Sequence, residues 1–391
     1  MHLIKLVAKD RNYFCIGIDN TKSVGTIIHS DTLFSALCNN LRKIHGKEFL
    51  EDILKLMNDD SNENVPELRI TSAFHYIDIF EGGRATCKAT IFFVPKPFMR
   101  LPLDANSQAF LEDNPKIFKK IKFVSFGIIS LLQKNQPIKL SSVHIFAGEY
   151  LVSSEEVELL GLKKYLELQE PNNQELLAIQ HKIQFHEVIE EQKVGIDRKS
   201  GTSKPFTWEK LSFLTSTYHV FEGSERKRYK LIPGFYFLLD LSKLPPEVTL
   251  KIKTAISLMK DEGLGGRRST GAGLLDEVEF KLLDDVDSLN HIFELSESNL
   301  LMSLSLVYPN HADLKNLKYF KLFNRSGYVF SSVSKSQRFQ DVTFLEEGSI
   351  FAQKIRGSLV QVASGEFQEK FHDVFKNGIG FYLHLGKSEG G

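Results

Sequence analysis

The eleven residues GLGGRRSTGAG, from Gly263 to Gly273, combine glycines with two adjacent arginines and two hydroxyl side chains. Glycine tolerates positive φ and close backbone approach, so such a loop can point main-chain N–H groups at an anion. Arg267 and Arg268 add planar cations that pair with phosphate. The stretch therefore predicts a phosphate-binding loop. The residues expected to bind are Gly263, Gly265, Gly266, Arg267, Arg268, Ser269, Thr270, Gly271 and Gly273.

Two simpler explanations of this loop remain open. Gly263 can merely end the preceding helix, and one of the two arginines can be held by a carboxylate within the protein. Lys22 and Ser23 are further candidates because they precede an expected helix, whose N-terminus can bind phosphate, although a solvated loop explains them equally well. A wider basic patch would draw on Lys96, Arg100, Arg325, Lys335 and Arg338.

A second candidate site is the tip of a long hairpin expected at residues 183–221. QFHEVI on one side and KLSFL with STYHVF on the other flank VGIDRKSGTSKPF, whose turn carries Ile196, Asp197 and Arg198. An apolar side chain can wedge between bases while an arginine holds the displaced phosphate. A plain turn, in which Asp197 and Arg198 pair with each other or with solvent, is the alternative.

Histidines and carboxylates raise the question of catalysis. His29 and Asp31 invite comparison with general acid–base residues. Asp31, however, directly follows Ser30, the expected N-cap of a helix, where the helix dipole already favours a carboxylate. His2, His75 and His219 lie in expected strands, and the histidines form no cluster or metal-ligand spacing in the sequence. We expect no catalytic residue, no metal and no cofactor.

Composition limits the class of protein. The 391 residues carry 49 Lys and Arg against 49 Asp and Glu, so a nucleic-acid site must be a local patch rather than an overall basic field. Cys15, Cys38 and Cys87 are far apart in the sequence, which argues against a disulfide framework and favours a reducing cytoplasm. The longest apolar run, starting at Phe123, is too short to span a bilayer, so membrane insertion is not expected.

The order of expected elements predicts an α+β fold. Strands near the N-terminus, a helix from Ser30, two further strands, a strand at 235–241, a helix and a final strand follow the βαββαβ order of a ferredoxin-like or RNA-recognition domain. We expect this domain at 1–298, with a helical insertion at about 105–180 and the hairpin. A strand-rich block at 299–391 is expected to be a second, reduced copy.

Five motifs in order carry a family resemblance: SDTLFSAL, TSAFHY followed by FVPKP, VGIDRKSGT, GLGGRRSTGAG and VFKNGIGFYLHL. Together they resemble the RAMP superfamily of CRISPR-associated proteins, and more narrowly the Csm subunits that cap the crRNA 5′ end in type III-A effector complexes. The motif set and its spacing favour type III-A over type III-B.

This resemblance implies tandem ferredoxin-like domains and a function in antiviral defence. The subunit would bind the crRNA 5′ handle without catalysis, between the large polymerase-like subunit and the first backbone RAMP subunit. In related backbone subunits a hairpin thumb kinks the guide, so the tip at Ile196 would mark the junction of handle and spacer. The alternative function is a RAMP endoribonuclease that processes precursor crRNA. A protein-only scaffold would leave the glycine–arginine loop unexplained.

Overall fold

The computed structural model describes residues 1–9, 12–17, 24–58, 68–167, 173–197, 199–289, 291–294, 300–329 and 337–386. Its main element is a ten-stranded sheet in the order β12-β1-β11-β3-β4-β5-β7-β6, with β2 and β10 also paired to β11. The strands of this sheet are β1 His2–Ala8, β2 Arg69–Ile70, β3 Phe74–Glu81, β4 Ala89–Pro95, β5 Phe123–Ser125, β6 Ile145–Phe146, β7 Tyr150–Leu151, β10 Ser216–Glu222, β11 Glu225–Asp240 and β12 Leu275–Leu282.

Four of these strands form a ferredoxin-like unit. Helix α1 (Ser30–Asn58) connects β1 to β3, and α8 (Pro246–Ser257) with α9 (Met259–Glu262) connects β11 to β12. The order β12-β1-β11-β3, antiparallel at every pairing, is the arrangement that the βαββαβ pattern predicts. The expected α+β class is therefore confirmed.

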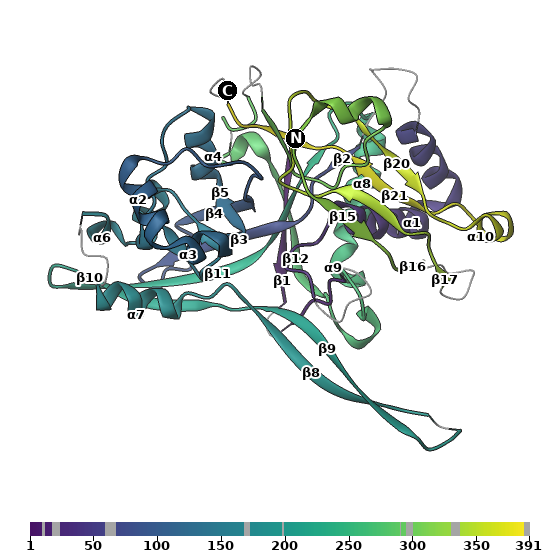
Figure 1. The fold of residues 1–391 in the computed structure, drawn as a ribbon. Coiled ribbons are helices and arrows are strands. Elements are labelled where there is room, and N and C mark those ends of the chain that lie inside the picture. Colours follow the sequence, from purple (N-terminus) through teal and green to yellow (C-terminus); the bar gives the residue numbers. More distant parts are fainter. Residues whose placement is uncertain are drawn as a thin grey trace.

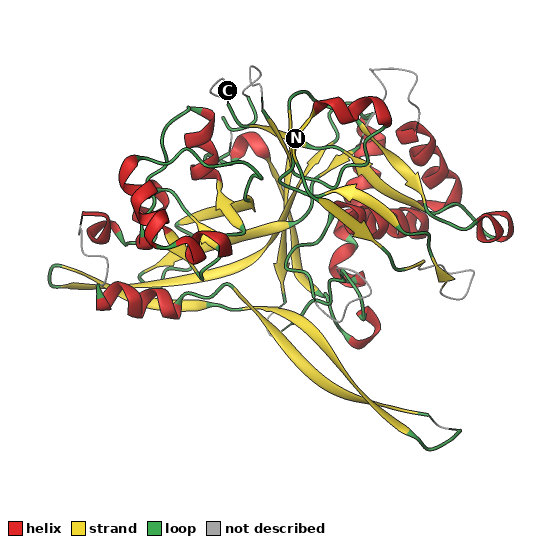
Figure 2. Cartoon of the chain, in the orientation of Figure 1, coloured by secondary structure: helices red, strands yellow, loops and turns green. Residues whose placement is uncertain are grey.

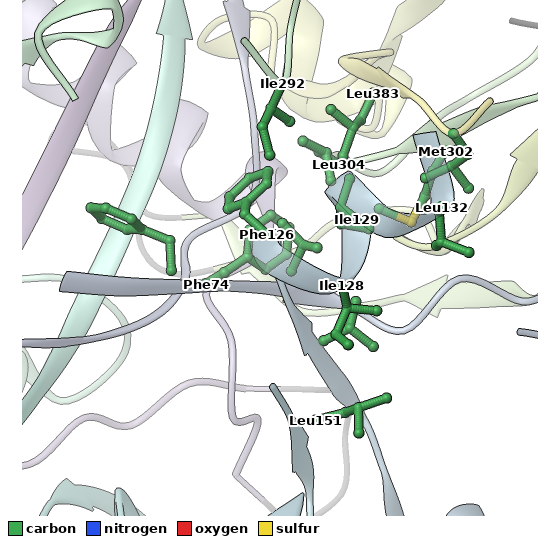
Figure 3. Packing of buried hydrophobic residues seen from close by; sticks show 14 of the residues in the cluster. Phe74, Phe126, Ile128, Ile129, Leu132, Leu151, Ile292, Met302, Leu304 and Leu383 are labelled. Atoms are coloured by element: carbon green, nitrogen blue, oxygen red, sulfur yellow. The ribbon is translucent and has the colours of Figure 1, made fainter. Parts of the chain in front are cut away.

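Alternating side chains of this sheet supply two separate cores. Ile4 and Phe237 face α1 and α8, where Leu37 and Ile256 are buried. Leu3 joins the opposite core, because successive strand residues point to opposite faces. Figure 3 shows that opposite core, in which Phe74 and Phe126 lie near Met302, Leu304 and Leu383 from the C-terminal part.

The inserted segment after β4 is largely helical, as expected, but it also adds β5, β6 and β7 to the sheet. Its apolar side chains, among them Tyr150 and Leu160, build a third core with β3 and β4. The helices of this segment are α2 Ala105–Asp113, α3 Pro115–Lys120, α4 Phe126–Gln133, α5 Ser154–Leu159, α6 Lys163–Glu167 and α7 Gln174–Lys182.

The described C-terminal residues form short strands, a six-residue 3-10 helix at His311–Asn316 and the six-residue α-helix α10 (Gly365–Lys370). A four-stranded sheet in the order β14-β19-β13-β22 is accompanied by the pairs β15-β18, β16-β17 and β20-β21. The strands are β13 Leu301–Ser303, β14 Leu317–Tyr319, β15 Leu322–Arg325, β16 Tyr328–Val329, β17 Gln337–Arg338, β18 Val342–Leu345, β19 Ile350–Phe351, β20 Gly357–Gln361, β21 Phe375–Ile379 and β22 Tyr382–His384.

A long two-stranded arm, formed by β8 (His186–Ile196) and β9 (Ser203–Phe213), projects from the body of the molecule (Figures 1 and 2). The expected hairpin was too long. STYHVF is not part of it, because this segment forms β10 and pairs with β11 from Ser216↔Leu231 to Glu222↔Glu225. The arm therefore ends at Phe213, and the following strand returns to the main sheet.

The start of α1 also differs from expectation. The helix begins at Ser30, so Ser30 is not its N-cap residue. Its hydroxyl instead accepts a hydrogen bond from the Leu306 N–H at 3.1 Å, which ties the helix to the C-terminal part. Gly46, with φ of 87°, interrupts the helical backbone within α1.

Candidate nucleic-acid interface

The glycine-rich loop is folded back onto the segment before α1. Gly263, with φ of 72°, ends α9. The Gly266 N–H donates to the Cys15 carbonyl at 2.7 Å, and the Gly273 N–H donates to the Tyr13 carbonyl at 2.8 Å. These glycines therefore hold the loop against the protein's own backbone.

Close approach explains why glycine is required at two positions. A Cβ atom at Gly273 would lie 1.9 Å from the Leu264 carbonyl oxygen, and one at Gly265 would lie 2.7 Å from the Cys15 carbonyl oxygen. Both glycines also have positive φ. Four glycine N–H groups that were expected to bind an anion already donate hydrogen bonds within the chain, so that expectation is wrong for them. They belong to Gly263, Gly266, Gly271 and Gly273.

The loop instead presents an arginine. Arg267 is exposed and adopts a left-handed backbone with φ of 56°. Its guanidinium carbon lies 4.2 Å from the centroid of the Trp208 ring and 5.9 Å from that of Phe206. Arginine planes stack favourably on aromatic faces, so the two rings of β9 set the orientation of this side chain.

Further cations and rings surround this contact. Lys193 Nζ lies 4.7 Å from the Trp208 ring centroid, and Lys210 Nζ lies 4.8 Å from that of Tyr13. The Tyr13 and Trp208 rings meet edge to face at 5.8 Å. We call this set the cation–aromatic cluster; it consists of Tyr13, Lys193, Phe206, Trp208, Lys210 and Arg267.

Strand register explains how the cluster forms. Lys193 pairs with Phe206 and Glu191 pairs with Trp208, so alternate residues of both strands point to one face of the arm. Glu191 lies within 3.5 Å of Lys193 and 3.2 Å of Lys210. Within the described part of the chain, no carboxylate lies at ion-pair distance from Arg267, so its charge is available to phosphate.

The opposite face of the arm is apolar toward its tip. Ile196 is 69% exposed and Val194 is 58% exposed. Asp197 accepts hydrogen bonds from the Lys199 N–H and the Ser200 hydroxyl, and the first of these contacts lowers the pKa of the Asp197 carboxyl. Arg198, whose pairing with Asp197 was the alternative, lies outside the described residues.

The contacts of the other loop residues and of the remaining predicted cations do not assign them to an RNA site. Arg268 is half-buried, whereas Ser269 and Thr270 are exposed. The Thr270 N–H and hydroxyl both bond to the Arg267 carbonyl, so this hydroxyl supports the turn. Of the remaining cations, Arg100 is exposed, Arg338 forms a surface ion pair with Asp341, and Lys22, Ser23 and Lys335 lie outside the described residues.

Arg325 does not lie at this interface. It is 8% exposed, and its Nε donates to Asp31 at 2.9 Å. Its other nitrogens donate to the Gly17 carbonyl and the Thr32 hydroxyl, and Lys376 Nζ also lies 2.9 Å from Asp31. Arg325 is therefore a structural residue, and the prediction that it contacts RNA is corrected because its donors are used inside the protein.

The electrostatics of Asp31 follow from this network. Burial alone would raise the pKa of its carboxyl, but the Arg325 guanidinium and the Lys376 ammonium hold the pKa well below its usual range. Asp31 is thus a buried, ionised anchor between α1 and two C-terminal strands. A nuclease role for Asp31 has no support in this geometry.

His29 and His75 have contacts inside the protein as well. His29 is 5% exposed and its Nδ1 lies 2.9 Å from Glu347 Oε1. The sequence showed no cluster of histidines, but the structure places His75 and His186 on the same tyrosine. Tyr150 Oη lies 2.8 Å from His75 Nδ1 and 3.0 Å from His186 Nδ1. Burial lowers the pKa of His75 well below its usual value, so its imidazole is held neutral.

No helix in the described part of the chain is long and apolar enough to cross a membrane. Nor do three or more His, Cys, Asp or Glu side chains of those residues come together as a metal site would require. The three cysteines are all free thiols.

Sequence reasoning missed most of the cation–aromatic cluster. Tyr13, Lys193, Phe206, Trp208 and Lys210 were not candidates, although Phe206, Trp208 and Lys210 alternate along one strand in a way that places them on one face. That alternation, beside the only tryptophan of the chain, was the signal that could have found them.

Comparisons with known proteins support the resemblance. Residues 296–385 match the family model of the CRISPR Csm4 C-terminal domain. A CRISPR system Cms protein Csm4 of Methanocaldococcus jannaschii is 29% identical over 385 residues, which cover 93% of this chain and 89% of the relative. A second Csm4, from Thermococcus onnurineus, is 22% identical and covers 93% of each chain.

A solved structure shares the fold. One chain of the crystal structure of the Csm3–Csm4 subcomplex in the type III-A CRISPR-Cas interference complex matches with a TM-score of 0.63 and 24% identity, over 99% of this chain and 100% of that chain. The resemblance predicted from the motifs is confirmed: residues 296–385 match the model of the Csm4 C-terminal domain, and the chain is similar to Csm4 proteins over almost all of its length.

Proposed function

We propose that this protein is a non-catalytic crRNA-binding subunit of a type III-A CRISPR (Csm) effector complex. It holds the 5′ repeat-derived handle and connects the large polymerase-like subunit to the backbone subunits. The observation that carries the proposal is the stacking of exposed Arg267 on Trp208, beside Phe206, on one face of the projecting arm.

The cluster has the properties that single-stranded RNA requires. Bases stack on aromatic faces, and cations follow the phosphates. Phe206 is 38% exposed and so offers a ring to a base, whereas Trp208 is 6% exposed and mainly supports Arg267. The glycine-rich loop contributes by fixing the position of Arg267 through the hydrogen bonds of Gly266 and Gly273 to the segment before α1.

The partners follow from the relatives. The matching solved chain comes from a Csm3–Csm4 subcomplex, which supports a backbone RAMP subunit as one partner. The large polymerase-like subunit as the second partner, and the cytoplasm as the location, rest on the family resemblance.

A non-catalytic role also fits the buried groups. His29 and Asp31 are the pair that invited comparison with nucleases. His29 contacts Glu347, Asp31 is ion-paired with Arg325, and both residues are at most 5% exposed. A processing nuclease would need an acid or base that can reach the scissile phosphate.

The test is binding of the host's handle RNA to the full chain as a function of salt. Replacing both Arg267 and Arg268 by Ala should weaken binding and reduce the slope of log K against log salt by about 0.7 for each phosphate that the variant no longer neutralises. Arg84→Ala, at an exposed arginine in the turn after β3, is the matched control and should change neither quantity. An unchanged slope in the double variant would contradict the proposal.

A further inference from the structure

The outer hairpin of the main sheet, formed by β10 and the first residues of β11, has two unlike faces. On one face Tyr218, Val220, Tyr229 and Leu231 are buried in the third core, together with Ile179 of α7. Successive strand residues point to opposite faces, so the residues between them lie on the side away from that core. Most side chains on that side are exposed.

Three cations follow one another along this exposed face. Arg226, Arg228 and Lys230 occupy alternate positions of β11, and all three are exposed. We call these three residues the hairpin cation strip. Alternate residues of a strand are about 6.8 Å apart, which is close to the distance between successive phosphates of an extended single strand. The strip can therefore place one cation at each of three consecutive phosphates.

The neighbouring strand adds an exposed ring and a histidine to the same face. The pairing Phe221↔Arg226 places the ring beside the first cation of the strip, and His219↔Arg228 places the imidazole beside the second. Phe221 is 51% exposed, although a side chain of this type is usually buried. An uncovered ring beside arginines can stack on a base while the arginines bind the flanking phosphates.

The positive charge of this face is not neutralised by the protein. Within the described residues, no carboxylate lies at ion-pair distance from any cation of the strip. Lys227, which points to the opposite face, lies instead 3.8 Å from Glu81. Partial burial and then three nearby cations, namely the two strip arginines and Lys182, lower the pKa of the His219 imidazole. A ligand on this face would therefore meet a positive field, which favours an anion.

The residue types of this face favour a nucleic-acid strand over a protein partner. The centre of a protein interface is apolar and depleted in charged residues. The described residues of the hairpin face are Thr217, His219, Phe221 and the three cations, so the Phe221 ring is its one large apolar group. A strand supplies both a base for that ring and a phosphate for each cation.

The strip lies apart from the cation–aromatic cluster. The hairpin of β10 and β11 ends at the left of Figure 1, whereas the arm of β8 and β9 projects toward the lower right. We propose that the hairpin cation strip is a second nucleic-acid contact, in which its three cations bind consecutive phosphates of a single strand and Phe221 stacks on one of the bases. This proposal does not rest on the function proposed for Arg267.

Fluorescence anisotropy of the full chain with a labelled oligouridylate of about 12 nucleotides tests the strip. The background is the Arg267 and Arg268 double alanine variant, so that the remaining binding belongs to other surfaces. Replacing the three strip cations by Ala in this background should weaken binding about tenfold or more and reduce the slope of log K against log salt by about 2, because three phosphate contacts are lost.

A matched control removes the same charge elsewhere. Lys47→Ala, Lys55→Ala and Lys251→Ala together delete three exposed lysines of α1 and α8 and should change neither the affinity nor the slope. Equal losses in the two triple variants would show that net charge alone is responsible and would overturn the proposal. Thermal unfolding checks that each variant folds, and the three single alanine variants of the strip serve if the triple variant does not.

Substitutions at Phe221 separate base stacking from plain apolar contact. Phe221→Tyr keeps a flat ring and should bind the oligouridylate as the background does, whereas Phe221→Leu should bind about tenfold more weakly. Full affinity in the leucine variant would exclude the stacked base. If the cations only keep the edge strand from pairing with other chains, the triple strip variant will self-associate in sedimentation while its salt slope stays unchanged, which would also overturn the proposal.

Cross-linking keeps the two surfaces distinguishable. An oligonucleotide that contains thiouridine should cross-link to the peptide with Phe221, in the parent and in the Arg267 and Arg268 variant alike. Cross-links confined to the arm and the glycine-rich loop would overturn the strip and leave the function proposed for Arg267 standing, and cross-links confined to the hairpin would do the reverse. Polyglutamate of equal charge should compete poorly; competition equal to that of unlabelled oligouridylate would assign the strip to an acidic protein instead. The affinity of an oligodeoxythymidylate of equal length distinguishes RNA from DNA as the source of the strand.

Discussion

Arg267 and Arg325 have opposite environments, although both were candidates for RNA binding from the sequence. Arg267 is exposed and lies on the Trp208 ring, with no carboxylate of the described chain at ion-pair distance. Arg325 is buried and bonded to Asp31, Thr32 and Gly17. The comparison teaches that an arginine's role depends on which of its donors the fold leaves available.

The neighbours of each arginine explain the difference. Arg325 shares Asp31 with Lys376, so two cations satisfy one buried carboxylate between the N-terminal and C-terminal parts. Arg267 lies on a loop whose backbone is fixed by Gly266 and Gly273, and its side chain remains at the surface. One region stabilises the fold, and the other exposes charge.

The largest expected effect comes from Arg325→Ala. Removing one partner of a buried ion pair leaves an uncompensated charge, so the free energy of unfolding should fall by about 3–5 kcal/mol. Denaturant unfolding measures this, and RNA affinity per folded molecule should stay unchanged. If stability falls by less than about 1 kcal/mol while RNA binding disappears, the two arginines have been assigned the wrong way round.

Acidification should separate folding stability from RNA binding. Burial lowers the pKa of His144 to about 4 from an ordinary 6.5. Between these values the unfolded state takes up a proton that the folded state does not, so stability falls as pH drops from 6.5 toward 4, by on the order of 2 kcal/mol at pH 5 from this residue.

The cation–aromatic cluster contains no histidine, so RNA affinity per folded molecule should be constant from about pH 7 to about pH 5. Unfolding curves and binding titrations at each pH measure the two quantities, and His144→Gln should reduce the pH dependence of stability without changing RNA affinity. A parallel loss of RNA affinity would show that the interface depends on a titrating group.

Shortening the arm sharpens the comparison within the exposed region. Deleting Val194–Pro205 and joining Lys193 to Phe206 through Asn-Gly keeps the observed register, because Lys193 and Phe206 are paired. The variant should fold, retain the Arg267 stack on Trp208, bind handle RNA about tenfold more weakly and dock poorly to the backbone subunit. Binding and assembly equal to the parent would show that the tip at Ile196 is not a thumb.

The smallest effect is expected at Arg338, which forms an exposed ion pair with Asp341 at 3.1 Å. Surface pairs contribute little, so Arg338→Ala should change the free energy of unfolding by no more than about 0.5 kcal/mol. RNA affinity should also be unchanged, as measured by the same titration. A clear loss of RNA binding would extend the interface into the C-terminal part.

Much of the fold could be predicted from periodicity. Leu33, Leu37 and Leu41 recur at helical spacing in the sequence, and all three are buried on α1. The arm was predicted, but its predicted range was too long. Apolar and polar residues alternate in STYHVF as in a hairpin strand, whereas this segment pairs with β11. Local patterns identify strands but not their partners, since pairing depends on residues distant in the chain.

The candidate site was only half predictable. The high content of glycine and arginine in one stretch predicted the loop and Arg267. The glycines of this loop, however, also hold it against the segment before α1. Tyr13, Trp208 and Lys210 come from separate segments, so their meeting could not be seen along the sequence. The same limit hid the contact of His75 with Tyr150 and His186.

The sequence by itself determined the α+β class, the arm and a loop that needs glycine, because each depends on spacing and on the conformational freedom of neighbouring residues. Only the tertiary structure decided what the side chains do. The donors of Arg325 are buried and hydrogen-bonded to residues distant in the chain, whereas those of Arg267 lie at the surface. A residue's free charge is a property of its surroundings, which are set by segments far away in the chain.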